Sequence, residues 1–355
     1  MASMAEPAIA VVIVNYRTAA LTLAALAALC GERERLPGLR AMIVDGGSGD
    51  DSVEQLRAGI ADRGWDDWVR LLPLAVNGGF GWANNQAMLT LLQSDNPPDY
   101  LHLLNPDTRI EPGAVGCLAG VLDRHPECAV AASLLLNEDG SPSGSAFRFP
   151  SIAREFDRGA RTAPLARWLG IAPVLIADAP AGAADWVTGA SMMIRATALR
   201  EVGLFDSGFF LYFEEVELMA RLARAGWSIR HEPSSRVCHI GGAATGKTYQ
   251  FADLRVAPPL PAYWFHSRRR LLVQLYGTPG AIAAGGAWLA GHALFLLRRA
   301  LGRAGGHVPT RREARDLLRH GFLPVSYDRQ PAITRWNDPP GQPPAWIAWA
   351  KGGGA

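Results

Sequence analysis

The sequence has few cysteines and no large excess of charge of one sign. Its 355 residues include four cysteines, scattered without the spacing of metal ligands. No basic segment followed by an apolar run opens the chain, so we expect no secretion signal and a reduced, cytoplasmic location. A formal net charge of +2 gives no general basic excess, and no nucleic acid partner is expected. The 49% hydrophobic content indicates a globular protein with a sizeable core.

The small net charge hides an asymmetry along the chain. From Phe251 to the end there are 14 Lys and Arg against 5 Asp and Glu, a net +9, which leaves −7 for the first 250 residues. The apolar run GAIAAGGAWLAGHALFLLRR (280–299) lies in this basic part, and its small residues and His292 argue against a membrane-spanning helix. Two alternatives stay open. In the first, residues 263–303 contact an anionic membrane surface and the protein is peripheral on the inner face of the plasma membrane. In the second, the run packs in the core.

The first part of the chain alternates short apolar runs with helical patterns. The runs AIAVVIVN, LRAMIVD, VRLLPL and YLHLLN are typical of strands, and TAALTLAALAAL, SVEQLRAGI and WANNQAMLTLL are typical of helices. This alternation predicts an α/β fold with a mostly parallel sheet flanked by helices. Polar or glycine residues follow each run, so four strand ends should meet at one edge, where open sheets of this kind bind ligands.

Two acids follow strand ends at this edge. Asp45 closes the second predicted strand, and Asp107 follows the fourth in the turn Asn-Pro-Asp-Thr, where Pro106 stops the strand. Together they suit a nucleotide, with one acid for the base or ribose and the other for Mg2+ or Mn2+. The alternative is that each acid bonds the backbone of its own turn.

A third acid is expected on the inner side of a helix. In EEVELMARLARAGW, helical spacing places Glu215 with Leu218, Met219 and Leu222 on the apolar side. Burial would raise the pKa of Glu215 towards that of a general base that deprotonates a hydroxyl. The alternative is an acid of the first turn at the rim of the core.

The other side of the same helix is predicted to be polar. There the spacing places Glu214, near the positive end of the helix dipole, and an exposed i, i+4 pair of Glu217 with Arg221.

A histidine and a glycine-rich segment follow. His239 could bind a metal or a phosphate oxygen, although a lone histidine is more often structural. GGAATGKT (241–248) satisfies the Walker A pattern, but paired prolines follow within about ten residues and no apolar strand ending in an acid comes after it. A nucleotide triphosphatase therefore stays only as an alternative.

Seven segments, taken in order, resemble the inverting glycosyltransferases of family 2, especially the bacterial rhamnosyltransferase-like branch. They are VVIVNYRT, MIVDGGSGDDS, NGGFGWANN, LLNPDT, DWVTGASMMIR, FFLYFEEVEL and HIGG, and they cover about residues 9–242. The resemblance implies a GT-A type, Rossmann-like fold. Residues 1–135 would hold the nucleotide sugar, 136–250 would bind the acceptor and carry catalysis, and 251–355 would form a basic helical extension with a Pro- and Trp-rich tail.

The resemblance also implies the site residues. The donor would contact Asn15, Tyr16, Arg17, Asp45, Asn77, Gly79, Phe80, Asn85 and Asn105. The acceptor would contact Trp186, Gly189 and Ala190. LLNPDT replaces the usual Asp-x-Asp, so Asp107 would be the metal ligand, and His239 maps onto a histidine that completes the metal site in some relatives. The family base is usually the Asp of a Glu-Asp pair, which maps onto Glu215, with Glu214 beside it.

The implied reaction moves a sugar, with inversion, from a dTDP- or UDP-sugar to a hydroxyl of a glycan or lipid-diphosphate acceptor in cell-surface polysaccharide synthesis. Rhamnose from dTDP-rhamnose is suggested by the branch alone. QPAITRW (330–336) lacks the spacing of the Gln-x-x-Arg-Trp motif of processive members, so we expect single transfer. A non-catalytic nucleotide-sugar-binding partner of a membrane assembly is a further alternative, and a homodimer is compatible with the sequence.

Overall fold

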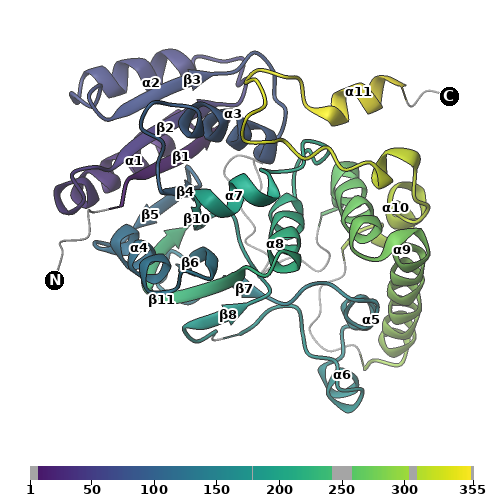
Figure 1. Cartoon of the computed structure of the whole chain (residues 1–355). Coiled ribbons are helices and arrows are strands. Elements are labelled where there is room, and N and C mark those ends of the chain that lie inside the picture. The colour runs from purple at the N-terminus through teal and green to yellow at the C-terminus, as the bar shows by residue number, and fades with distance from the viewer. Residues whose placement is uncertain (1–6, 178, 242–257, 304–309, 353–355) are drawn as a thin grey trace.

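The fold is built on one mixed sheet. The structure, a computed structural model, describes residues 7–177, 179–241, 258–303 and 310–352. Within these ranges a nine-stranded sheet has the order β3-β2-β1-β4-β10-β6-β11-β5, with β8 also paired to β11 (Figure 1). A two-stranded sheet pairs β7 (Ala146–Phe147) with β9 (Trp186–Val187).

The N-terminal part of the sheet is parallel, as predicted. Its strands are β1 (Ile9–Asn15), β2 (Arg40–Asp45), β3 (Val69–Pro73) and β4 (Tyr100–Leu104). The helices between them are α1 (Ala19–Arg35), α2 (Ser52–Ala61) and α3 (Phe80–Leu92). Neighbouring strands in this part run parallel, and the register pairs Asn15 with Asp45. The four strand ends therefore meet at one edge.

The second part of the chain completes the same sheet. Its strands are β5 (Thr108–Ile110), β6 (Cys128–Leu136), β8 (Gly182–Ala184), β10 (Ser191–Arg195) and β11 (Ser228–His239). Its helices are α4 (Ala114–Arg124), α5 (Ile152–Ala160), α6 (Ala163–Trp168), α7 (Ala196–Val202) and α8 (Glu214–Arg224). Strand β10 lies antiparallel between β4 and β6, so the sheet runs across the predicted division at residue 135.

The core lies on both faces of this sheet. Because strand side chains alternate, Ile9, Val11 and Ile13 of β1 pack in one apolar cluster, with residues of α1, α2 and α4. Ala10 and Val12 pack in the other, with residues of α3 and α8. Burial on both faces explains why the strands are nearly continuous apolar runs.

The C-terminal region begins with α9 (Ala262–Ala300), which is two helices joined at a kink. Gly277 has φ 69° within it and Pro279 follows, a combination that breaks helical hydrogen bonding. Beyond it lie α10 (Glu313–Asp316), η3 (Leu317–Gly321), η4 (Ser326–Arg329) and α11 (Ala345–Gly352). The tail then runs back over α3, where the Trp346 indole donates to Gly78 O and the Trp82 indole donates to Gln342 O (Figure 1).

Three consecutive arginines in the first half of α9 are buried. Arg270 donates to both carboxylate oxygens of Asp206, at 2.7 and 2.9 Å, and Arg269 donates to Asp328 at 2.6 Å. Arg268 donates to Glu155 at 2.5 Å. Part of the basic excess of the C-terminal region is thus internal, and Arg268 and Arg270 pair with acids from the acidic first part of the chain.

We predict that Arg270→Met destabilises the fold strongly. Asp206 is fully buried, and loss of its cationic partner would leave an uncompensated charge, which costs about 3–5 kcal/mol. Urea unfolding measures the change. Arg299→Met, at an exposed position of the same helix, is the control and should shift the unfolding free energy by less than about 0.5 kcal/mol. Equal effects from the two substitutions would contradict the role given to the Asp206 pair.

Candidate active site

Side chains at the ends of β1 and β2 form a closed hydrogen-bond network. Asp45 Oδ2 accepts from Asn15 Nδ2 at 2.7 Å and from Ser48 Oγ at 2.6 Å, and Asp45 Oδ1 accepts from Ser48 N at 3.0 Å. Asn15 and Asp45 are buried. Asp45 therefore bonds its own turn, which was the alternative left open by the sequence, and a contact of this side chain with a nucleotide stays a prediction.

Tyr16 and Arg17 present the more accessible groups at the same edge. Arg17 is exposed and Tyr16 half-buried, and the guanidinium lies 5.2 Å from the centre of the Tyr16 ring. Arg17 has φ 57°, and Ser48 holds this left-handed turn by accepting from Arg17 N at 2.9 Å. An accessible ring beside a cation suits the base of a nucleotide. Ser48 lies in the quoted glycine-rich motif but was not singled out from the sequence.

The two predicted metal ligands lie side by side. His239 Nε2 is 3.3 Å from Asp107 Oδ1, and Asn105 Nδ2 is 3.5 Å from the same nitrogen. The cause is the antiparallel pairing of β5 with β11, whose register places His239 opposite Thr108. A carboxylate and an imidazole fit a divalent cation that shares its remaining positions with substrate phosphates. In the described residues no three or more His, Cys, Asp or Glu gather as a complete metal site.

Of the segment GGAATGKT (241–248), only Gly241 is described. Residues 242–248 of it, Lys247 included, lie outside the described residues.

The glycine loop before α3 allows a close approach of two backbones. Gly79 has φ 91°, and a Cβ there would lie 1.8 Å from Phe210 O. Phe80 N donates to that same oxygen at 3.1 Å, and Asn77 Oδ1 accepts from Gly79 N at 3.0 Å. A side chain at position 79 would separate the loop from the segment that leads into α8.

Asn85 joins α3 to the same segment. It is fully buried, bonds both the backbone N and O of Phe205, and donates to Thr334 Oγ1 at 2.9 Å. The structure thus shows a positioning contact for Asn85, and a contact with a donor stays a prediction.

The predicted acceptor residues do not form one cluster. Ala190 O accepts from Asn105 N at 2.9 Å, and Gly189 lies against the Phe80 ring. Trp186 stacks on Phe147 with 4.1 Å between ring centroids and lines a cavity of about 250 Å³ beside the start of α8.

The expectation that Glu214 faces away from the core is wrong. Glu214 is only 3% exposed and packs on the first turn of α3, where a Cβ at Gly81 would lie 3.3 Å from its Cγ. Two left-handed residues, Tyr212 (φ 70°) and Phe213 (φ 71°), precede it and carry the chain into the helix. Such strained backbone has no sequence signal and is often found at functional sites. The chain that enters the helix through these two residues helps to bury the first turn, which helical spacing alone does not predict.

Both adjacent carboxyls have raised pKa values. Glu215 is half-buried, and burial raises its pKa to about 7. Burial, together with the charge of Glu215, raises the pKa of Glu214 well above its usual range. An Oε2 atom of each is inaccessible and has no hydrogen-bond partner. Two neighbouring carboxyls with different environments can divide the protonated and ionised states between them.

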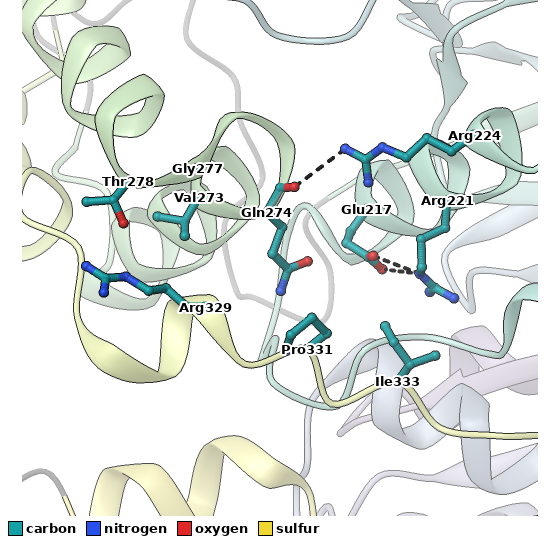
Figure 2. Close-up of a pocket in the computed structure, with 10 residues that line it drawn as sticks. All are labelled: Glu217, Arg221, Arg224, Val273, Gln274, Gly277, Thr278, Arg329, Pro331 and Ile333. Atoms are coloured by element: carbon teal, nitrogen blue, oxygen red, sulfur yellow. Dashed lines mark hydrogen bonds and ion pairs between the residues drawn. The ribbon is translucent and has the colours of Figure 1, made fainter.

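Glu217 and Arg221 form the predicted pair, but the pair is not an ordinary surface one. Arg221 Nε donates to both oxygens of Glu217, at 2.7 and 3.0 Å, and the guanidinium also donates to the carbonyls of Val202 and Leu204. Glu217 is buried. Figure 2 shows this pair beside a cavity of about 470 Å³ where α8, the kink of α9 and the tail meet. The cavity lies apart from the predicted site residues, none of which line it.

Comparison with known proteins identifies the domain. Residues 10–178 match the sequence model of glycosyl transferase family 2. The chain is 31% identical over 194 residues to an N-acetylglucosaminyl-diphospho-decaprenol L-rhamnosyltransferase of Mycobacterium tuberculosis, which is 50% of this chain and 61% of that protein. It is 34% identical over 55 residues to rhamnosyltransferase WbbL of Escherichia coli, 16% of this chain and 21% of that one. The chain thus matches about three fifths of the length of the first relative and about a fifth of the second.

Solved structures support the fold. A mannosyltransferase from Pyrobaculum calidifontis, solved with GDP-Man and Mn2+, aligns with a TM-score of 0.50 at 14% identity over 83% of this chain and 76% of its own. GalNAc-T7, solved with UDP, GalNAc and Mn2+, aligns with the same score and identity over 67% and 44%. With the strand order, these likenesses support a GT-A fold. Residues 10–178 form a glycosyl transferase family 2 domain, and the chain is similar in sequence to bacterial rhamnosyltransferases.

Proposed function

We propose that this protein is an inverting glycosyltransferase that moves one sugar from a nucleotide-sugar donor to an acceptor hydroxyl. The observation that carries the proposal is the contact path from the Asp107–His239 pair to the glutamates of α8. Asn105 bonds Ala190, Gly189 lies against Phe80, and the turn that follows Phe80 packs on Glu214. These contacts connect the Asp107–His239 pair with the first turn of α8, which supports the proposal that the metal site and the base act on one bound donor.

The donor would lie along the ends of β1, β2 and β4. Tyr16 and Arg17 would contact the base, while Asp45 would hold their turn in place. Asp107 and His239 would hold Mg2+ or Mn2+, which when bound neutralises the charge of the departing nucleoside diphosphate.

The two glutamates would have different roles. With a pKa near 7, Glu215 is partly ionised at neutral pH and can accept the proton of the acceptor hydroxyl. Glu214 is more deeply buried and would stay protonated, so it would not compete as the base. The hydroxyl oxygen would then attack the anomeric carbon from the face opposite the leaving group, which inverts the configuration.

Donor and acceptor identity come from similarity. The name of the mycobacterial relative specifies transfer of L-rhamnose to a sugar carried on a lipid diphosphate. By analogy we propose dTDP-rhamnose or a related UDP-sugar as donor, and a glycan or lipid-diphosphate acceptor in cell-surface polysaccharide synthesis. The comparisons give no support for a P-loop nucleotide triphosphatase. A non-catalytic nucleotide-sugar-binding protein would show no donor hydrolysis.

We predict that Asp107→Asn removes the metal dependence of nucleoside diphosphate binding. The amide lacks the charge of the carboxylate that would hold the cation. Calorimetric titration of UDP and dTDP, with and without Mn2+, measures the effect. Asp139→Asn, in an exposed turn, is the control. If Asp107→Asn keeps the affinity and the metal dependence of the unaltered protein, the metal assignment is wrong.

We predict that Glu215→Gln lowers transfer by about a hundredfold to ten-thousandfold with donor affinity unchanged, because a general base contributes about that much. The matched control is Glu214→Gln, which mimics the protonated carboxyl and should lose much less. The active form of Glu215 is the ionised one, so the rate should rise with pH and level off above about 7. Single-turnover transfer, or slow donor hydrolysis, measured from pH 5 to 9 tests this. A pH profile that survives in Glu215→Gln and disappears in Glu214→Gln would move the base by one residue.

We also propose that the second half of α9 contacts a membrane surface. Its inner face packs on α5, where Gly159 and Gly291 allow close backbone approach. Its outer face is apolar and exposed, with Leu297 59% and Leu301 62% exposed beside the exposed Arg299. By length and composition, Ala262–Ala300 is the one helix of the described residues that could cross a membrane, and a third of its apolar window is buried. The kink and this packing favour an interfacial helix.

We predict that the double substitution Leu297→Asp, Leu301→Asp lowers binding to phosphatidylglycerol vesicles by at least about tenfold, because two leucines lose their burial in the lipid interface. Vesicle sedimentation measures it. Leu175→Asp, a leucine 42% exposed outside α9, should leave binding unchanged. If the unaltered protein stays in the supernatant at every lipid concentration, the proposal is wrong.

A further inference from the structure

A second cavity near α8 combines arginines with aromatic rings. It measures about 250 Å³, and its principal lining residues are Arg154, Arg158, Arg268, Trp186, Phe213 and Trp264. Phe213 precedes the first residue of α8 and Val216 also lines the cavity, so the space adjoins the turn that carries Glu214 and Glu215.

Arg268 has hydrogen-bonding capacity that the protein does not use. It is 2% exposed, and its Nη2 donates to Glu155 at 2.5 Å, but its Nε and Nη1 atoms have no partner. Buried donors are nearly always paired, because a donor that has lost water and gained no acceptor is costly. Each of the two unpaired N–H groups, which point to different sides of the guanidinium, can donate to an oxygen of a bound anion.

The charges around the cavity leave one cation in excess. Arg158 is fully engaged with Glu155 and Glu313 and lies over the rings of Trp264 and Trp288. Arg161 also pairs with Glu313. Arg154 donates only to the carbonyls of Phe149 and Ala172.

The charged groups that line the cavity, together with the ion-pair partners Glu313 and Arg161, are four arginines (154, 158, 161 and 268) and three acids (Glu155, Asp157 and Glu313). The cavity is therefore suited to one anionic group.

We propose that this cavity binds the phosphate of a sugar-phosphate acceptor, with Arg268 and Arg154 on the phosphate oxygens and Trp186 or Trp264 against the sugar ring. The identification as an acceptor site rests on the proposed function. At about 250 Å³ the cavity lies below the usual range of small-molecule pockets, about 300–1,000 Å³, so it suits one phosphorylated sugar and not a whole nucleotide sugar. Its position beside the first turn of α8 would bring an acceptor hydroxyl towards Glu215.

Calorimetric titration with glucose 1-phosphate in EDTA tests the site, because the donor edge should need its metal to bind phosphates. The unaltered protein should bind the probe. Arg268→Lys keeps a cation for Glu155 but removes the unpaired Nε–H and Nη1–H groups, and it should weaken binding by at least about tenfold. Arg154→Met should weaken it as well. The matched control is Asp107→Asn, which should bind glucose 1-phosphate normally and lose Mn2+-dependent binding of UDP and dTDP, whereas Arg268→Lys should do the reverse.

The outcomes separate this inference from the proposed function. If Arg268→Lys does not fold by circular dichroism, Arg154→Met decides alone. Equal affinity for glucose 1-phosphate in the unaltered protein and the folded variants overturns the cavity assignment. So does an absence of binding by an unaltered protein that still binds UDP or dTDP with Mn2+. Binding of glucose 1-phosphate without any metal-dependent binding of either nucleotide supports the cavity and overturns the proposed donor site.

Discussion

The structure depends on how the segment 204–213 is held from three sides. From α3, Asn85 bonds the backbone of Phe205, and Phe80 N donates to Phe210 O. From α9, Arg270 binds Asp206 and Ser267 donates to Leu211 O. From the tail, Ala332 N donates to Asp206. A segment fixed at so many points can keep Tyr212 and Phe213 in left-handed backbone, and this determines where the first turn of α8 lies.

The uneven charge distribution along the chain is partly neutralised by ion pairs inside the molecule. Buried ion pairs connect the acidic first part with the basic C-terminal region, as in Asp206 with Arg270 and Glu155 with Arg268. Because desolvation offsets much of the attraction, such pairs are better evidence of specific geometry than of added stability. They dock α9 in one orientation, leaving its apolar second half on α5. The remaining exposed arginines, such as Arg299 and Arg303, stay available for an anionic surface.

The same burial accounts for the chemistry proposed at α8. Two carboxyls one residue apart, in surroundings with little water, cannot both ionise readily. The more accessible Glu215 then titrates near neutral pH, and Glu214 stays protonated at higher pH. The depth of each carboxyl, and not its position in the motif, is what distinguishes a base from its neutral neighbour.

The sequence by itself determined the strands and helices through β4, their parallel arrangement and the edge where the strand ends meet, because apolar periodicity is a local signal. Its ordered motifs also indicated the family 2 domain that residues 10–178 match. Helical spacing put Glu215 with Leu218 on the inner side of α8 and Glu214 and Glu217 on the other side. In the structure Glu214 and Glu217 are buried, whereas Glu215 is only half-buried. The spacing of apolar residues along one helix does not show which other elements of the fold pack against it. Other features join residues that lie far apart in the sequence. They are the contact of Asp107 with His239, the buried pairs of Arg268 with Glu155 and of Arg270 with Asp206, and the cavity beside α8. Only the tertiary structure decided these, because strand register and interhelical packing depend on side chains that a linear pattern does not bring together.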